Sequence, residues 1–284
     1  MIVKLGMLIV FFGVMVGIGL YCRRHATDVN GFVLGGRSVG PWLTAFAYGT
    51  SYFSAVVFVG YAGQFGWKYG IAATWAGIGN ALLGSLLAWA VLGRRTRIMT
   101  QHLSSATMPE FFGKRFGSDK LKIAASVIIF IFLIPYTASL YNGLSRLFGM
   151  AFHIDYSLCV IVMAVLTGVY VIAGGYMATA INDFIQGIIM IFGICAVIAA
   201  VLHSQGGFMA ALEGLAQVQD PEVSQAPGVF ASFFGPDPMH LLGVVLLTTS
   251  GTWGLPHLLQ KYYPLKDEKA IANGMAISTV IHVL

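Results

Sequence analysis

The chain has 284 residues, of which 57% are hydrophobic and only 10% are charged, and its formal net charge is +5. Soluble domains carry about 25% charged residues, so this composition excludes an ordinary soluble protein and indicates a membrane protein with several spans. The basic residues lie in short segments between apolar runs, which argues against nucleic acid as a partner and for the lipid bilayer.

Long runs without Asp, Glu, Lys or Arg predict the membrane helices, because a span needs about 20 apolar residues. In chain order the predicted helices cover residues 3–22, 41–66, 70–92, 121–147, 156–177, 183–204, 239–262 and 269–284. A short helix at 108–116 either dips into the headgroup region or packs on the underside of the protein. We expect one transmembrane domain over 1–284, incomplete at its C-terminal end because the last apolar run is too short to span.

The basic residues also predict the orientation. If the loop after the first helix is placed inside, most of the 16 Lys and Arg residues fall on that same side. Cytoplasmic loops are enriched in Lys and Arg, so we expect a multi-pass protein of the plasma membrane whose N-terminus is external.

Two of the predicted helices contain segments that disfavour a continuous helix. YGTSYFSA (48–55) places a glycine and three hydroxyl side chains inside a run that is uncharged from Ser38 to Trp67. TTSGTWGLP (248–256) again mixes glycine with hydroxyl residues and adds Pro256. Either segment alone could simply bond its hydroxyls to its own helix or pack closely on a neighbour.

Together the two segments favour a transporter. They lie in the second and seventh predicted helices, and this odd separation gives them opposite orientations across the membrane. Interrupted helices at corresponding positions of inverted repeats are typical of the central site of a secondary transporter. We expect the second predicted helix (41–66) to unwind near Gly49, so that main-chain oxygens face a cation.

Several motifs resemble the sodium:solute symporter family, which includes sodium-coupled proline, pantothenate and sugar transporters. They are FVLGGRSVG (32–40), TMPEFFGKRF (107–116), GGYMATAINDFIQ (174–186) and GLPHLLQKY (254–262). The resemblance implies an all-α integral membrane fold of five-plus-five inverted repeats behind one extra N-terminal helix. This chain would then hold the first repeat and the start of the second.

The resemblance also implies site residues. The family's sodium ligands on the first core helix, two main-chain carbonyls, fall on Thr50 and Phe53, with Ser51 and Ser54 flanking them. Asp183 matches an aspartate of the inner sodium pathway, although it could also simply cap a helix.

Candidate substrate contacts come from the second break and from one aromatic residue. Tyr136 faces the site in the family, and Trp253 could stack on a small solute between Ser250 and Thr252, although buried aromatic residues more often only pack. The family's proline transporters carry an aspartate where this chain has Tyr52, which argues against proline as the solute.

The function expected from these features is sodium-coupled symport of a small organic solute by alternating access, with Na⁺ as the coupling ion and no other cofactor. Two alternatives stay open: a solute-sensing membrane domain without net transport, and proton-coupled symport. No enzyme is expected, because no apolar segment pairs a nucleophile with a base or shows metal-ligand spacing. The sequence does not indicate an oligomeric state.

Overall fold

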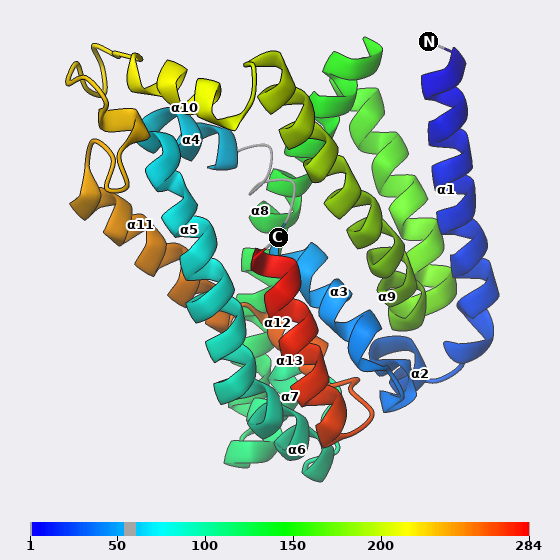
Figure 1. Ribbon diagram of the computed structural model, residues 1–284. Helices are drawn as coiled ribbons and strands as arrows, with labels where there is room; N and C mark the ends of the chain where they lie inside the picture. Colours follow the sequence, from blue (N-terminus) through cyan, green and yellow to red (C-terminus); the bar gives the residue numbers. More distant parts are fainter. Residues whose placement is uncertain (1, 54–60, 284) are drawn as a thin grey trace.

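The computed structural model describes residues 2–53 and 61–283, and within these ranges the chain forms helices and no β-strand (Figure 1). The α-helices are α1 (Ile2–Cys22), α2 (Val29–Leu34), α3 (Pro41–Tyr52), α4 (Gly63–Tyr69), α5 (Thr74–Gly79), α6 (Arg94–His102), α7 (Met108–Phe116), α8 (Asp119–Phe152), α9 (Tyr156–Ser204), α10 (Phe208–Ala216), α11 (Pro238–Gly251), α12 (Pro256–Leu259) and α13 (Glu268–Val283). Short 3₁₀ or π segments join them: η1 (Arg23–His25), η2 (Gly35–Arg37), η4 (Gly70–Ala73), η5 (Asn80–Leu87), η6 (Trp89–Gly93), η7 (Val229–Ala231), η8 (Thr252–Gly254) and η9 (Gln260–Tyr262).

Four helical stretches in the described part of the chain are long and apolar enough to cross a membrane. They are Leu5–Cys22, Gly63–His102, Asp119–Phe152 and Tyr156–Ser204. The prediction of an all-helical chain with membrane-compatible helices is therefore confirmed for the described residues. The two interrupted helices, α3 and α11, contain 12 and 14 residues and are each too short to span alone.

The longest helix differs from its prediction. Helices at 156–177 and 183–204 were expected with a linker between them, but α9 runs through that region, and its one non-helical residue is Gly175 at φ 58° and ψ −149°. This conformation is accessible almost only to glycine, so a single residue turns the chain without any linker. A Cβ at Gly175 would lie 2.7 Å from the Phe32 carbonyl oxygen, so glycine also permits close packing on α2.

Helix α9 lies at the centre of one group of packed helices and contacts α1, α3 and α8. Small residues allow these approaches, as is common between membrane helices. A Cβ at Gly174 would lie 2.7 Å from the Gly19 carbonyl oxygen of α1, and a Cβ at Gly187 would lie 2.5 Å from the Phe46 ring of α3. In Figure 1, α5 and α11 form the opposite side of the molecule, and α3, α12 and α13 lie between the two sides.

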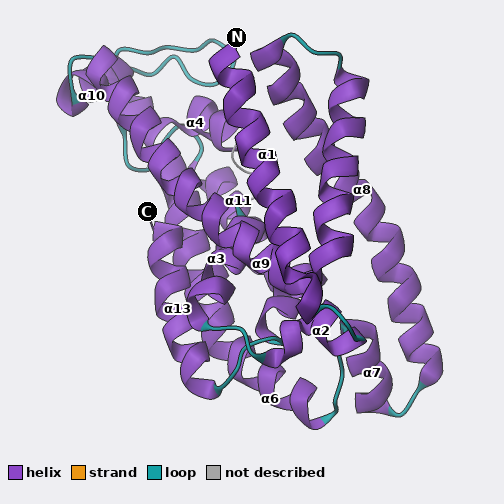
Figure 2. Ribbon diagram, turned by 90° about the vertical axis from the view of Figure 1, so that its right-hand side faces the viewer, coloured by secondary structure: helices purple, strands orange, loops and turns teal. Residues whose placement is uncertain are grey.

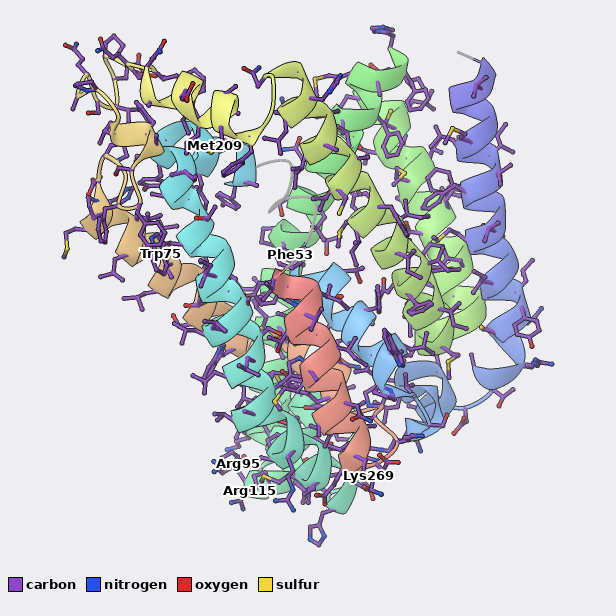
Figure 3. All side chains as sticks on the ribbon, in the orientation of Figure 1. Phe53, Trp75, Arg95, Arg115, Met209 and Lys269 are labelled. Atoms are coloured by element: carbon purple, nitrogen blue, oxygen red, sulfur yellow. The ribbon has the colours of Figure 1, made fainter. Side chains whose placement is uncertain are left out.

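The two ends of the molecule differ in charge. Arg95, Arg115 and Lys269 lie at one end, whereas Met209 lies towards the other (Figure 3). Most connecting loops also lie near these two ends (Figure 2). The N-terminus lies at the end away from Arg95, and its external location remains a prediction. We call the end that carries Arg95 the basic end.

Arg37, from the FVLGGRSVG motif, ties the loops of the basic end together. Its guanidinium donates to the carbonyl oxygens of Tyr263 (3.2 Å), Thr100 (3.1 Å) and Ser105 (2.7 Å). Arginine suits this position because its planar head offers several donors in fixed directions. One side chain therefore joins η2 to α6, to the segment after α6 and to the residue after η9.

Candidate functional site

The first interruption lies one turn later than expected. Helix α3 ends at Tyr52, and Phe53 leaves helical geometry at φ −85° and ψ 64° while its N–H still donates to the Gly49 carbonyl (2.8 Å). The helix is therefore interrupted inside the predicted segment 48–55, but at Phe53 and not at Gly49 itself. Gly49 is helical, and a Cβ there would lie 3.2 Å from Ile281 of α13, so this glycine serves close packing.

The second interruption lies within the predicted segment. Helix α11 ends at Gly251, η8 covers Thr252–Gly254, and Leu255 is extended at φ −71° and ψ 119° before Pro256 opens α12. Proline suits the first turn of a helix, where its missing N–H costs nothing.

The two interrupted helices end beside each other. Helix α3 rises from the basic end and α11 descends from the opposite end (Figure 1), and the Thr252 hydroxyl donates to the Tyr52 hydroxyl oxygen (3.3 Å). The C-terminal end of a helix carries a partial negative charge. Two such ends meeting near mid-height make this region favourable for a cation.

A cavity of about 630 Å³ lies at this meeting point. Its walls come from both interrupted helices and from α4 and α5, and its lining residues are Tyr52, Phe53, Tyr61, Ala62, Phe65, Ala73, Thr74, Ala76, Gly77, Asn80, Leu247, Thr248, Gly251, Thr252 and Leu255. None of these residues carries a formal charge. A cavity of this size and mostly apolar lining is typical of a small-molecule site.

Asn80 organises the polar part of the cavity. Its carboxamide oxygen accepts a short hydrogen bond from the Tyr52 hydroxyl. Its amide nitrogen donates to the Ala76 carbonyl (2.7 Å) and to the Thr248 hydroxyl (3.3 Å). Asn80 also begins the π-helical turns of η5, a wide geometry that is frequent at functional sites. One side chain therefore links α3, η5 and α11.

An aromatic cluster lies on the basic side of this cavity. It consists of Tyr48 and Tyr52 of α3, Trp89 of η6 and Tyr262 of η9, all buried. The ring centroids of Trp89 and Tyr262 are 4.9 Å apart, and those of Tyr48 and Tyr262 are 5.8 Å apart. Tyr52 belongs to both the cluster and the cavity lining, so packed rings lie directly against the cavity.

The predicted cation residues are only partly placed at the cavity. Phe53 lines it, and Figure 3 shows this residue at mid-height. The Thr50 hydroxyl donates to the Phe46 carbonyl of its own helix (2.9 Å), and Ser51 is half-buried in the last turn of α3. Ser54 lies outside the described residues.

The predicted substrate residues separate into different places. Thr252 lines the cavity, but the Ser250 hydroxyl donates to the Leu246 carbonyl (2.5 Å) and the Trp253 indole donates to the Leu83 carbonyl (2.9 Å). Tyr136 of α8 lies in another groove, of about 470 Å³, where its ring stacks on His257 with centroids 4.8 Å apart. The structure does not bring Tyr136 together with Thr252.

Asp183 lies within α9, after the kink at Gly175, and forms an ion pair. Lys261 of η9 donates to its Oδ2 (3.2 Å), and the two side chains are 22% and 12% exposed. A charge buried to this degree needs a partner, which Lys261 supplies.

Sequence reasoning missed Asn80 and Thr248 as cavity residues, and it noted Tyr52 only for differing from the family. A signal for Asn80 was present, because it is the one carboxamide in the uncharged run 69–93. Polar residues inside membrane helices usually face the interior or a cavity. No comparable signal marks Thr248 among its neighbouring hydroxyl residues.

Comparisons with known proteins agree with the motifs. A model of the sodium:solute symporter family matches residues 32–284. Similar curated proteins include the sodium/proline symporters of Staphylococcus aureus strains JH9 and JH1, each 30% identical over 272 residues. The match covers 94% of this chain and 51% of each relative, so the chain spans about half the length of these proteins.

Proposed function

The chain belongs to the sodium:solute symporter family, and on this premise we propose that it takes part in sodium-coupled symport of a small organic solute by alternating access. The observation that carries the proposal is the meeting of the two interrupted helices, α3 and α11, at one cavity. Because these helices run in opposite directions, their meeting also supports a five-plus-five inverted-repeat fold.

Sodium binds, in this proposal, at the end of α3. The carbonyl oxygens of Thr50 and Phe53 are the ligands, and Ser51 and Ser54 flank them. A hard cation prefers oxygen ligands, and the C-terminal ends of α3 and α11 add partial negative charge from two directions. The cation thus needs no carboxylate in the cavity.

The solute occupies the cavity beside this cation. The described lining offers apolar walls and one polar cluster, made of Tyr52, Asn80, Thr248 and Thr252. Such a site suits a compact solute with an apolar body and a group that makes hydrogen bonds. The family's proline transporters carry an aspartate at the position of Tyr52, so this cavity lacks their carboxylate. We therefore favour a solute other than proline, although the relatives are named sodium/proline symporters.

Uptake by the full-length protein in proteoliposomes tests this function. A radiolabelled panel of L-proline, other amino acids, pantothenate and glucose is offered with an inward sodium gradient, and again with choline in place of sodium. Accumulation of one compound that requires the sodium gradient is the expected result.

Two other outcomes would contradict the proposal. Accumulation that follows an imposed pH gradient at constant sodium would indicate proton coupling. Saturable binding of a compound that never accumulates would indicate a solute sensor.

A further inference from the structure

One largely buried ion pair joins helix α9 to η9, a short segment that follows the second interruption. Lys261 lies in η9, which follows α12 on the far side of the second interruption, and Asp183 lies in α9. The other ion pairs found among the described residues differ. Arg94 and Glu268 are 67% and 57% exposed, and Lys114 and Glu110 are neighbours on one helical turn. The Lys261–Asp183 pair alone among these joins distant elements within a buried environment.

The surroundings of Lys261 resemble those of a bound cation. Its ammonium is 3.2 Å from the Asp183 carboxylate and 5.5 Å from the centroid of the Tyr176 ring. The Tyr176 hydroxyl is buried and has no hydrogen-bond partner among the described residues. The carboxylate and the ring face already attract one positive charge, and the unpaired hydroxyl offers a further oxygen.

The same short segment also belongs to the aromatic cluster beside the cavity. Tyr262, the residue after Lys261, packs on Trp89 and Tyr48 in the aromatic cluster. A movement of η9 that opens the cluster would therefore also move Lys261 away from Asp183. The ion pair and the aromatic cluster are two parts of one closure.

The charges of Lys261 and Asp183 connect this closure to sodium binding. While Lys261 neutralises Asp183, a sodium ion has little attraction to this carboxylate, because the two cations compete for the same oxygens. Once Lys261 leaves, Asp183 is a buried anion without a partner and attracts a mobile cation strongly.

We propose that Lys261 is a tethered cation that holds the inner path closed by pairing with Asp183, and that sodium passes Asp183 only after Lys261 has moved away. This inference rests on the proposed sodium symport. Lys261 is a positioning residue here: it acts through Asp183 and binds neither solute nor sodium.

Hydrogen–deuterium exchange on the full-length protein tests the closure without requiring transport. The peptide spanning 255–266 should exchange about tenfold faster in Lys261→Gln and in the neutral double variant Asp183→Asn/Lys261→Gln, a change equivalent to about 1.4 kcal/mol. In Lys261→Arg this peptide should take up deuterium at the wild-type rate. The variant Asp183→Lys/Lys261→Asp, which swaps the two charges, should restore slow uptake. Arg94→Gln, which removes an exposed pair at the same end, is the matched control and should change nothing.

Sodium flux tests the competition. In proteoliposomes without solute, release of trapped ²²Na⁺ should rise about tenfold in Lys261→Gln and stay near the wild-type rate in the double variant, which lacks the attracting carboxylate. The proposal would be overturned if Lys261→Gln showed the wild-type rate of hydrogen–deuterium exchange, or if Asp183→Lys/Lys261→Asp failed to slow that exchange. Equal sodium flux in the single and double variants would also overturn it. If the wild type transports nothing with sodium, the proposed function fails while the exchange data still decide whether the pair closes this end.

Discussion

Asn80 is the residue whose replacement should most directly affect the solute site. Its carboxamide bonds Tyr52, Thr248 and the Ala76 carbonyl, so Asn80→Leu leaves the buried Tyr52 hydroxyl without its acceptor. An unsatisfied buried group costs about 1–3 kcal/mol. We expect the KM for solute uptake to rise roughly tenfold or more.

Ser85→Ala is the control for this change. Ser85 lies in the same segment, η5, but bonds Ser278 (3.1 Å) and does not line the cavity. The KM of the Ser85→Ala protein for solute uptake should stay close to the wild-type value. An Asn80→Leu protein with unchanged KM would show that the solute does not bind in this cavity.

Glu110 should give the protein a measurable dependence on acid pH. Burial raises the pKa of this carboxyl, but the Lys114 ammonium, the Ala106 N–H (2.8 Å) and the charge of Lys122 together bring its pKa below the ordinary value of 4.5. A lowered folded-state pKa means that the carboxylate stabilises the fold above pH 4.5 and loses this effect as pH falls through the lower value.

Glu110→Gln provides the comparison. In detergent, the wild type should melt at a higher temperature than Glu110→Gln at pH 7, and this difference should shrink as the pH falls below 4.5. A difference in melting temperature that is independent of pH would contradict an ionised Glu110.

At the scale of elements, Gly175 sets the kink of α9 and hence the position of Asp183. Its φ of 58° and ψ of −149° strain any other residue, and a Cβ would lie 2.7 Å from the Phe32 carbonyl oxygen. We expect Gly175→Ala to cost about 2 kcal/mol or more. Gly168→Ala on the same helix is the control, since a Cβ there meets nothing within 4 Å and alanine favours a helix. Equal melting temperatures for the two variants would refute this role of Gly175.

The interrupted helices also show how far sequence could predict the elements. Glycine, hydroxyl residues and proline marked both breaks, because these residues weaken a helix through their local chemistry. The exact end of α3 depends instead on tertiary packing: Gly49 stays helical because α13, more than 200 residues later, needs close approach there. The kink at Gly175 was missed for a similar reason, since its neighbour Phe32 lies in a distant segment.

For the whole molecule, composition alone predicted a helical membrane protein, and spacing within motifs indicated the family. The cavity could be predicted less well. Thr252 and Phe53 were expected from local patterns, but Asn80 enters the site only because η5 packs against both interrupted helices. Tyr136 instead faces a groove beside His257, which is a feature of packing between α8 and α12 that no local pattern encodes.

A structure of the full-length protein in saturating sodium would show whether the ends of α3 and α11 meet around a cation. We expect α3 to remain interrupted after Tyr52, with density for an ion against the carbonyl oxygens of Thr50 and Phe53 that is absent when choline replaces sodium. A helix that continues unbroken from Pro41 to Gly66, with no ion at these carbonyls in sodium, would contradict this expectation.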